Sequence, residues 1–141
     1  MAGVYSYVAR SDLPKSLLEL VYLRISQING CAYCIDTHSR DLLKNGMEIE
    51  KLVLVPAWRE AVRLFSEKER AALAWAETIT CVAESGVSEE DFAAASTVFN
   101  SQQLSDLTIA IGLMNAYNRL AISFRAVPSA VLLAPIPSAA E

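Results

Sequence analysis

The sequence is poor in the residues that most reactive sites use, because it has one histidine, three cysteines and four lysines. With a net charge of −4 it lacks the clustered basic residues that bind phosphate backbones, which argues against a nucleic-acid-binding function. No charge-free run before the C-terminal tail approaches the roughly 20 residues that cross a bilayer. Arg10, Asp12 and Lys15 also interrupt any apolar run of the kind found in signal peptides. We therefore expect a cytoplasmic protein with no membrane span.

Segments with the alternating pattern of β-strands are also missing. Apolar residues instead recur at helical spacing, and glycine or proline separates these runs. At 141 residues the chain has the size of one domain. The sequence therefore predicts an all-α, single-domain fold. It consists of an N-terminal arm at residues 1–11, a helical domain at 12–127, and an extended tail at 128–141 in which prolines should prevent a helix.

Five stretches carry the clearest helix signals, approximately residues 12–29, 31–45, 66–83, 88–99 and 101–125. The third begins with the capping-box pattern of Ser66 and Glu69, and the last is apolar around most of its circumference. Glu19 falls inside the first. A carboxylate in such a helix is ordinarily a solvated surface residue, so the residues alone leave the role of Glu19 open.

The scarce residues are concentrated in one stretch, GCAYCIDTH at residues 30–38. Helical spacing places Cys31, Cys34 and His38 on one face, and Gly30 puts Cys31 at the helix N-cap with Cys34 in the first turn. Unpaired backbone N–H groups at that end favour a thiolate, which is the nucleophilic form of cysteine. His38, one turn after Cys34, could accept the thiol proton. The stretch therefore predicts a redox-active dithiol with its own base.

Other interpretations of the same residues remain. The cysteines could be inert core residues, as Cys81 is expected to be. Cys31, Cys34 and His38 could instead bind zinc, with Cys81 or Glu19 as the fourth ligand. Attachment of a c-type haem is excluded, because it needs histidine directly after the second cysteine and this chain has isoleucine there.

The stretch is part of a longer pattern: Glu19-x11-Cys31-x2-Cys34-x3-His38, then ERAALAW at residues 69–75 and NAYNRL at 115–120. This pattern resembles the alkylhydroperoxidase AhpD-like core of the carboxymuconolactone decarboxylase family, over about residues 12–128. The resemblance implies an all-helical subunit that assembles into trimers or hexamers. For members with the dithiol, it also implies reduction of peroxides or disulfides.

The resemblance assigns roles to four residues. Cys34 matches the peroxidatic cysteine, Cys31 the resolving cysteine, His38 the relay histidine, and Glu19 the carboxylate that orients it. Family peroxidases also carry a histidine directly before the second cysteine, where this chain has Tyr33. The implied activity needs no metal, flavin or haem cofactor, and its partners are a small-molecule peroxide and a dithiol reductant.

Composition independently favours assembly. Apolar residues make up 53% of the chain and the mean hydropathy is +0.30, which is high for a small soluble monomer. We therefore expect a homo-oligomer. Two other functions remain as alternatives: an oligomeric protein whose dithiol is a non-catalytic redox switch, and a lactone decarboxylase of the kind that names the family. The decarboxylase branch works without a cysteine pair, so the intact dithiol argues against it.

Overall fold

The computed structural model describes residues 1–136, and all regular structure in that range is helical, which confirms the all-α prediction. The elements in order are α1 (Ala2–Ala9), α2 (Lys15–Asn29), α3 (Ala32–Lys44), α4 (Ile49–Val53), the 3-10 helices η1 (Val55–Ala57) and η2 (Val62–Leu64), α5 (Glu67–Thr80), α6 (Val82–Ser85), α7 (Glu89–Val98), α8 (Ser101–Ser123) and α9 (Ser129–Leu133). None of these helices is both long and apolar enough to cross a bilayer.

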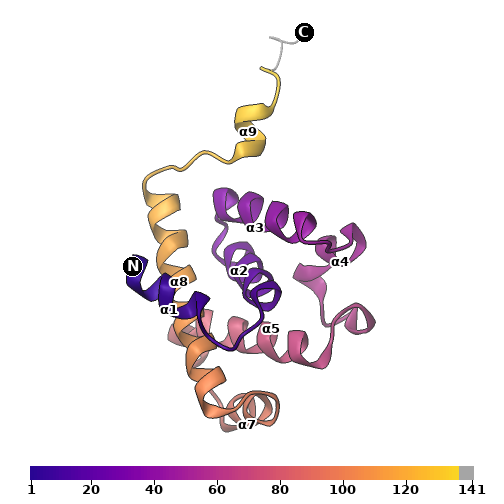
Figure 1. The fold of residues 1–141 in the computed structure, drawn as a ribbon, viewed down its shortest axis with the longest axis vertical. Coiled ribbons are helices and arrows are strands. Elements are labelled where there is room, and N and C mark those ends of the chain that lie inside the picture. The colour runs from indigo at the N-terminus through magenta and orange to yellow at the C-terminus, as the bar shows by residue number, and fades with distance from the viewer. Residues whose placement is uncertain (137–141) are drawn as a thin grey trace.

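The central element is α2, and α3, α5 and α8 pack around it (Figure 1). It carries no internal proline or glycine, and it ends at Gly30, whose φ of 69° is the left-handed conformation that favours glycine. One core cluster lies on the α5 and α8 side and includes Val21, Ile25, Ala72, Leu107 and Ile111. A second lies on the α3 side and includes Leu20, Leu23, Leu42, Val55 and Leu73. Because α2 contributes to both clusters, it fixes α3 relative to the rest of the domain.

A carboxylate on α5 connects α2 to the irregular segment that follows α4. Glu77 Oε1 accepts hydrogen bonds from Arg24 Nε at 2.7 Å and from Trp58 Nε1 at 3.0 Å, and Glu77 also forms an ion pair with Arg59. Burial raises the pKa of Glu77, but hydrogen bonds from Arg59, Arg24 and Trp58 outweigh it and lower the pKa below its ordinary value. This polar group stabilises the packing of segments that surround the second core cluster.

The N-terminal segment differs from its prediction. It was expected as an arm without clear helix or strand length, lying on the body or on a neighbouring subunit; residues 2–9 form helix α1, which packs on α8 of the same chain. The Tyr7 hydroxyl donates a hydrogen bond of 2.7 Å to Asp106 Oδ1, and Val8 is buried in the first core cluster. The sequence interpretation missed this helix because the helix is short, and a contact distant in sequence holds it in place.

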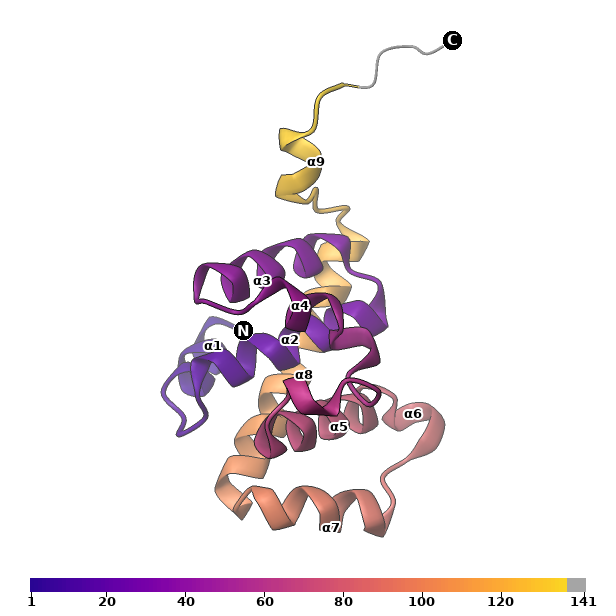
Figure 2. The same cartoon turned by 90° about the vertical axis from the view of Figure 1, so that its right-hand side faces the viewer.

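The tail also differs from its prediction, which was wrong for residues 129–133. They form α9, because Pro128 stands at the N-cap, where its missing N–H removes no helical hydrogen bond. The backbone N–H of Ala130 donates to Asp36 Oδ2 of α3 at 3.0 Å. Beyond that contact α9 stands away from the body (Figure 1, Figure 2), and its Leu132 and Leu133 are 72% and 75% exposed. The part of the predicted tail at 137–141 lies outside the described residues.

Candidate functional site

The turn between α2 and α3 positions the two cysteines of the motif. Gly30 reverses the chain, and the Cys31 N–H then donates to the carbonyl of Ser26 at 2.9 Å. Cys31 is the N-cap of α3, and its Sγ accepts a hydrogen bond from the Cys34 N–H at 3.3 Å. The predicted placement of Cys31 at the cap and Cys34 in the first turn is confirmed.

Cys31 and Cys34 are joined in a disulfide, with Cα atoms 5.3 Å apart. Both residues are buried. The third cysteine, Cys81, is unpaired and partly exposed at the C-cap of α5, so it is not the core residue that its sequence context suggested. The structure therefore brings together the two cysteines of the motif and leaves the third elsewhere.

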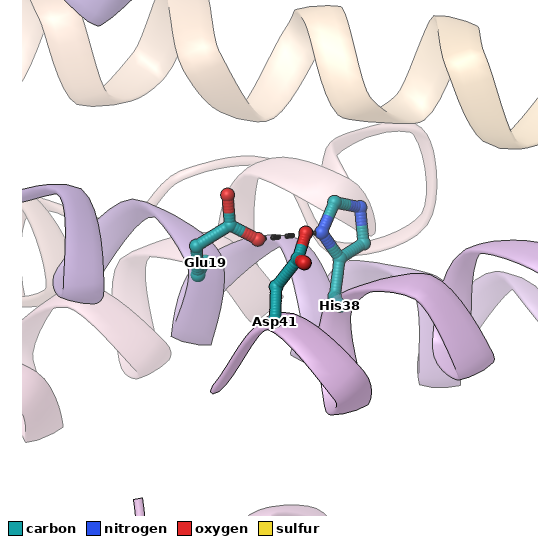
Figure 3. A group of neighbouring side chains, drawn as sticks. All are labelled: Glu19, His38 and Asp41. Atoms are coloured by element: carbon teal, nitrogen blue, oxygen red, sulfur yellow. Dashed lines mark hydrogen bonds and ion pairs between the residues drawn. The ribbon is translucent and has the colours of Figure 1, made fainter. Parts of the chain in front are cut away.

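Glu19 and His38 meet across the interface of α2 and α3 (Figure 3). His38 Nδ1 lies 2.7 Å from Glu19 Oε2, and Glu19 is only 7% exposed, so it is not a solvated surface residue. An ionised carboxylate can only accept a hydrogen bond. When Glu19 accepts from Nδ1–H, the other ring nitrogen, Nε2, is the one that can accept a proton. The hydrogen bond therefore fixes the orientation of the imidazole ring between α2 and α3.

Asp41 completes this group and was missed by the sequence interpretation (Figure 3). It lies three residues after His38 on α3, a spacing that puts both side chains on one helical face. Ligand atoms of Glu19, His38 and Asp41 lie within 4.8 Å of one another, so two carboxylates and an imidazole could hold a divalent cation. The proposed zinc set had used the cysteines instead, but these pair with each other and are not part of this group.

Cys34 and His38 open into one cavity of about 500 Å³. Its walls come from α1, α2, α3 and α8 and the chain after α8, and they are mainly aromatic and aliphatic: Tyr5, Tyr22, Tyr33, Met114, Tyr117, Leu120, Ala121, Phe124 and Ala126. Two other cavities on the described chain are larger, about 620 and 640 Å³, but no cysteine or histidine lines them. Chemistry rather than size therefore identifies the cavity at Cys34, which we call the dithiol cavity.

Tyr22 is the most buried tyrosine of the dithiol cavity. It follows Glu19 by three residues on α2, and its ring centroid lies 5.4 Å from that of His38 at a tilt of 51°. Burial raises the pKa of Tyr22 far above its ordinary value, and the negative charge of Glu19 raises it further. The phenol therefore stays protonated at any pH at which the protein would work.

Comparison with known sequences shows which protein family this chain is similar to. The sequence model of the Carboxymuconolactone decarboxylase family matches residues 1–78, a range that contains Glu19, Cys31, Cys34 and His38. YdfG, an uncharacterized protein of Bacillus subtilis (strain 168), is 32% identical over 123 residues, or 87% of this chain and 83% of YdfG. YnjA, an uncharacterized protein of Escherichia coli (strain K12), is 35% identical over 106 residues, or 75% of this chain and 57% of YnjA.

Comparison with solved structures agrees with the sequence match. A crystal structure of a protein of unknown function from Agrobacterium tumefaciens, described as a candidate antioxidant defence protein AhpD, superposes with a TM-score of 0.85. The two chains are 32% identical, and the match covers 96% of this chain and 88% of the other. The fold around the disulfide and the Glu19–His38 pair is therefore shared with that protein almost from end to end.

Proposed function

Because the chain belongs to the carboxymuconolactone decarboxylase family and has its AhpD-like fold, we propose that it is a thiol-dependent peroxidase that reduces organic hydroperoxides in antioxidant defence. The observation that carries this proposal is the 2.7 Å hydrogen bond between Glu19 and His38 in the cavity that also contains Cys34. A dithiol with an oriented base beside it is what attack on a peroxide requires. A purely structural disulfide would not need the buried Glu19.

The first chemical step begins from the reduced protein. His38 Nε2 takes the Cys34 proton, and Glu19 stabilises the imidazolium through Nδ1. The thiolate attacks the terminal oxygen of ROOH, the O–O bond breaks, and Cys34 becomes a sulfenic acid. The departing RO⁻ receives the proton that His38 had taken and leaves as ROH.

The second step uses Cys31. Its thiol displaces the hydroxyl of the Cys34 sulfenic acid, which forms the disulfide and releases water. In the disulfide the two Cα atoms are 5.3 Å apart, inside the ordinary range for disulfides, so the folded chain accommodates the product of this step. A dithiol reductant of another molecule then reduces the disulfide and is itself oxidised to a disulfide.

Turnover distinguishes this enzyme from a redox switch. In a coupled assay with excess dithiol reductant, we expect many equivalents of cumene hydroperoxide to be consumed per subunit, and none by the Cys34→Ser variant. A switch would consume one equivalent per subunit and then stop. Peptide mapping after a single turnover should find the Cys31–Cys34 bridge, whereas a bridge that includes Cys81 would contradict the mechanism.

We further propose that the subunits form a homo-oligomer, with a trimer or hexamer favoured by the family resemblance. Support comes from apolar side chains that the isolated subunit leaves in solvent around α9 and the end of α8. Phe124 is 82% exposed and Leu133 75% exposed. Apolar side chains gathered in this way on a soluble protein usually mark an interface.

A further inference from the structure

We propose that the Tyr22 hydroxyl donates a hydrogen bond to the oxygen that leaves when the peroxide bond breaks. This inference rests on the proposed peroxidase function and adds a residue to it. The mechanism above gives Cys34 a base and a resolving partner, but it leaves the negative charge that develops on RO⁻ without a fixed donor before the proton arrives. Tyr22 is the side chain of the dithiol cavity whose position and protonation state suit that role.

The position of Tyr22 follows from its helix. It lies one turn from Glu19 on α2, packs its ring against His38, and lines the same cavity as Cys34. The residue is only 4% exposed, whereas Tyr5 and Tyr33 of the same cavity are 51% and 42% exposed. Tyr22 is therefore held by packing beside the reacting groups, while those two tyrosines lie at the mouth.

The hydroxyl of Tyr22 is available to a substrate. It makes no hydrogen bond to any residue of the described chain, although Tyr7, by contrast, donates to Asp106 at 2.7 Å. It is also not among the fully enclosed polar atoms without a partner in that part of the chain, so it reaches open space. A nearly buried phenol with an unused donor is uncommon, because buried hydroxyl groups are normally paired.

Tyr22 lines the dithiol cavity, and so does His38, the side chain that its ring packs against. Tyr22 also borders a smaller cavity of about 250 Å³, which shares Tyr5 and Glu19 with the dithiol cavity. Cys34 and His38 line the dithiol cavity but not the smaller one. Because the Tyr22 ring packs on His38, we take the dithiol cavity as the space that the hydroxyl reaches.

The electrostatics fix what Tyr22 can do. Burial and the Glu19 carboxylate both raise its pKa, so the phenol keeps its proton and is available as a hydrogen-bond donor. In the reaction, its O–H would point at the oxygen of RO⁻ as the O–O bond lengthens. The proton that completes ROH still comes from His38, so Tyr22 ends the step unchanged and the atoms balance as before. A donor that is fixed before charge develops stabilises the transition state more than the ground state.

The test compares leaving groups of different basicity. An alkyl hydroperoxide such as tert-butyl hydroperoxide releases a strongly basic alkoxide, whereas peroxyacetic acid releases weakly basic acetate, which needs little help from a donor. We expect Tyr22→Phe to lower the second-order rate constant of Cys34 oxidation by tert-butyl hydroperoxide roughly 10- to 150-fold, the range for loss of one hydrogen bond to a charged group. The loss with peroxyacetic acid should be less than about threefold on the same reasoning.

The control is Tyr7→Phe, which removes a hydroxyl outside the dithiol cavity that is already bonded to Asp106. We expect no difference between the two oxidants in this variant. An equal loss with both oxidants in Tyr22→Phe, or no loss with either, would overturn the role of Tyr22. Absence of any hydroperoxide reduction by the unmodified protein would instead overturn the proposed function.

If Tyr22→Phe does not fold, 3-fluorotyrosine incorporated at Tyr22 keeps the ring and makes the phenol a stronger donor. We then expect the rate constant for tert-butyl hydroperoxide to rise relative to that for peroxyacetic acid. An unchanged ratio of the two rate constants in this protein would equally overturn the proposal.

Discussion

The replacement Glu19→Gln separates the orienting hydrogen bond from the rest of the site. Glutamine has nearly the same size and keeps an oxygen that can accept from His38 Nδ1, but it has no charge. The Glu19 and His38 side chains are only 9% and 13% exposed, so solvent screens their interaction weakly. A hydrogen bond to a charged group is worth about 1.5–3 kcal/mol, which corresponds to roughly a 10- to 150-fold change in rate.

We expect the loss to be near the lower half of that range, about 10- to 50-fold, because the amide oxygen retains a neutral hydrogen bond. The assay is stopped-flow oxidation of reduced protein in a Cys81→Ser background, so that only the motif cysteines react. Far-ultraviolet circular dichroism and thermal melting should be close to those of the parent protein.

Asp41→Asn is the matched control, since it removes an equal charge from the same group without breaking a hydrogen bond to His38 among the described residues. We expect its rate loss to be several-fold smaller than that of Glu19→Gln. Equal losses in the two variants would show that net charge matters and the hydrogen bond does not. An unchanged rate in Glu19→Gln would remove Glu19 from the mechanism altogether.

Three further predictions concern the fold and the assembly of subunits. Hydrogen bonds keep the pKa of Glu77 below its ordinary 4.5 despite burial, so the stability it contributes is present above that pH and is lost as pH falls through the lower folded value. Glu77→Gln should reduce the unfolding free energy by about 1–3 kcal/mol at pH 7 in urea titrations, and the difference from the parent should shrink in acid. Gly30→Ala should cost about 1 kcal/mol and lower the melting temperature without affecting packing, because a Cβ there meets no atom within 4 Å and only the backbone conformation is strained. Deletion of residues 127–141 should weaken assembly in light scattering, whereas a 15.4 kDa monomer for the intact chain at micromolar concentration would falsify the oligomer proposal.

Local signals in the sequence predicted much of the fold correctly. Gly30 ended α2, Cys31 capped α3, and the Ser66 capping box began α5, since each depends on residues within one turn. Pro128 is also a local signal, but it was misread. The rule that proline ends helices was applied at a position where proline begins one. Helix α1 carried no such signal, because Tyr7 meets its partner Asp106 across 99 residues.

The candidate site was predictable only in part. The spacing of Cys31, Cys34 and His38 placed them on one helix, but Glu19 acquired a role through the family resemblance and not through its own sequence context. Tyr22 was missed, although its spacing of three residues from Glu19 put it on the same face of α2. Spacing predicts which side chains share a face of a helix, but the packing of α2 on α3 and α8 decides which of these faces meet.

The disulfide and the Glu19–His38 hydrogen bond differ in how much of the chain each needs. The cysteines are 3 residues apart, while Glu19 and His38 are 19 apart and on different helices. Closing so short a loop costs little entropy, so a nascent or denatured chain can form the disulfide before α2 and α3 have met. Such a chain has no oriented base, so its dithiol would be oxidised by peroxide slowly and without catalytic turnover. At denaturant concentrations that abolish peroxide turnover, we therefore expect thiol titration still to show oxidation of Cys31 and Cys34. Newly synthesised chains should likewise be open to oxidation by peroxide before they have folded enough to reduce it.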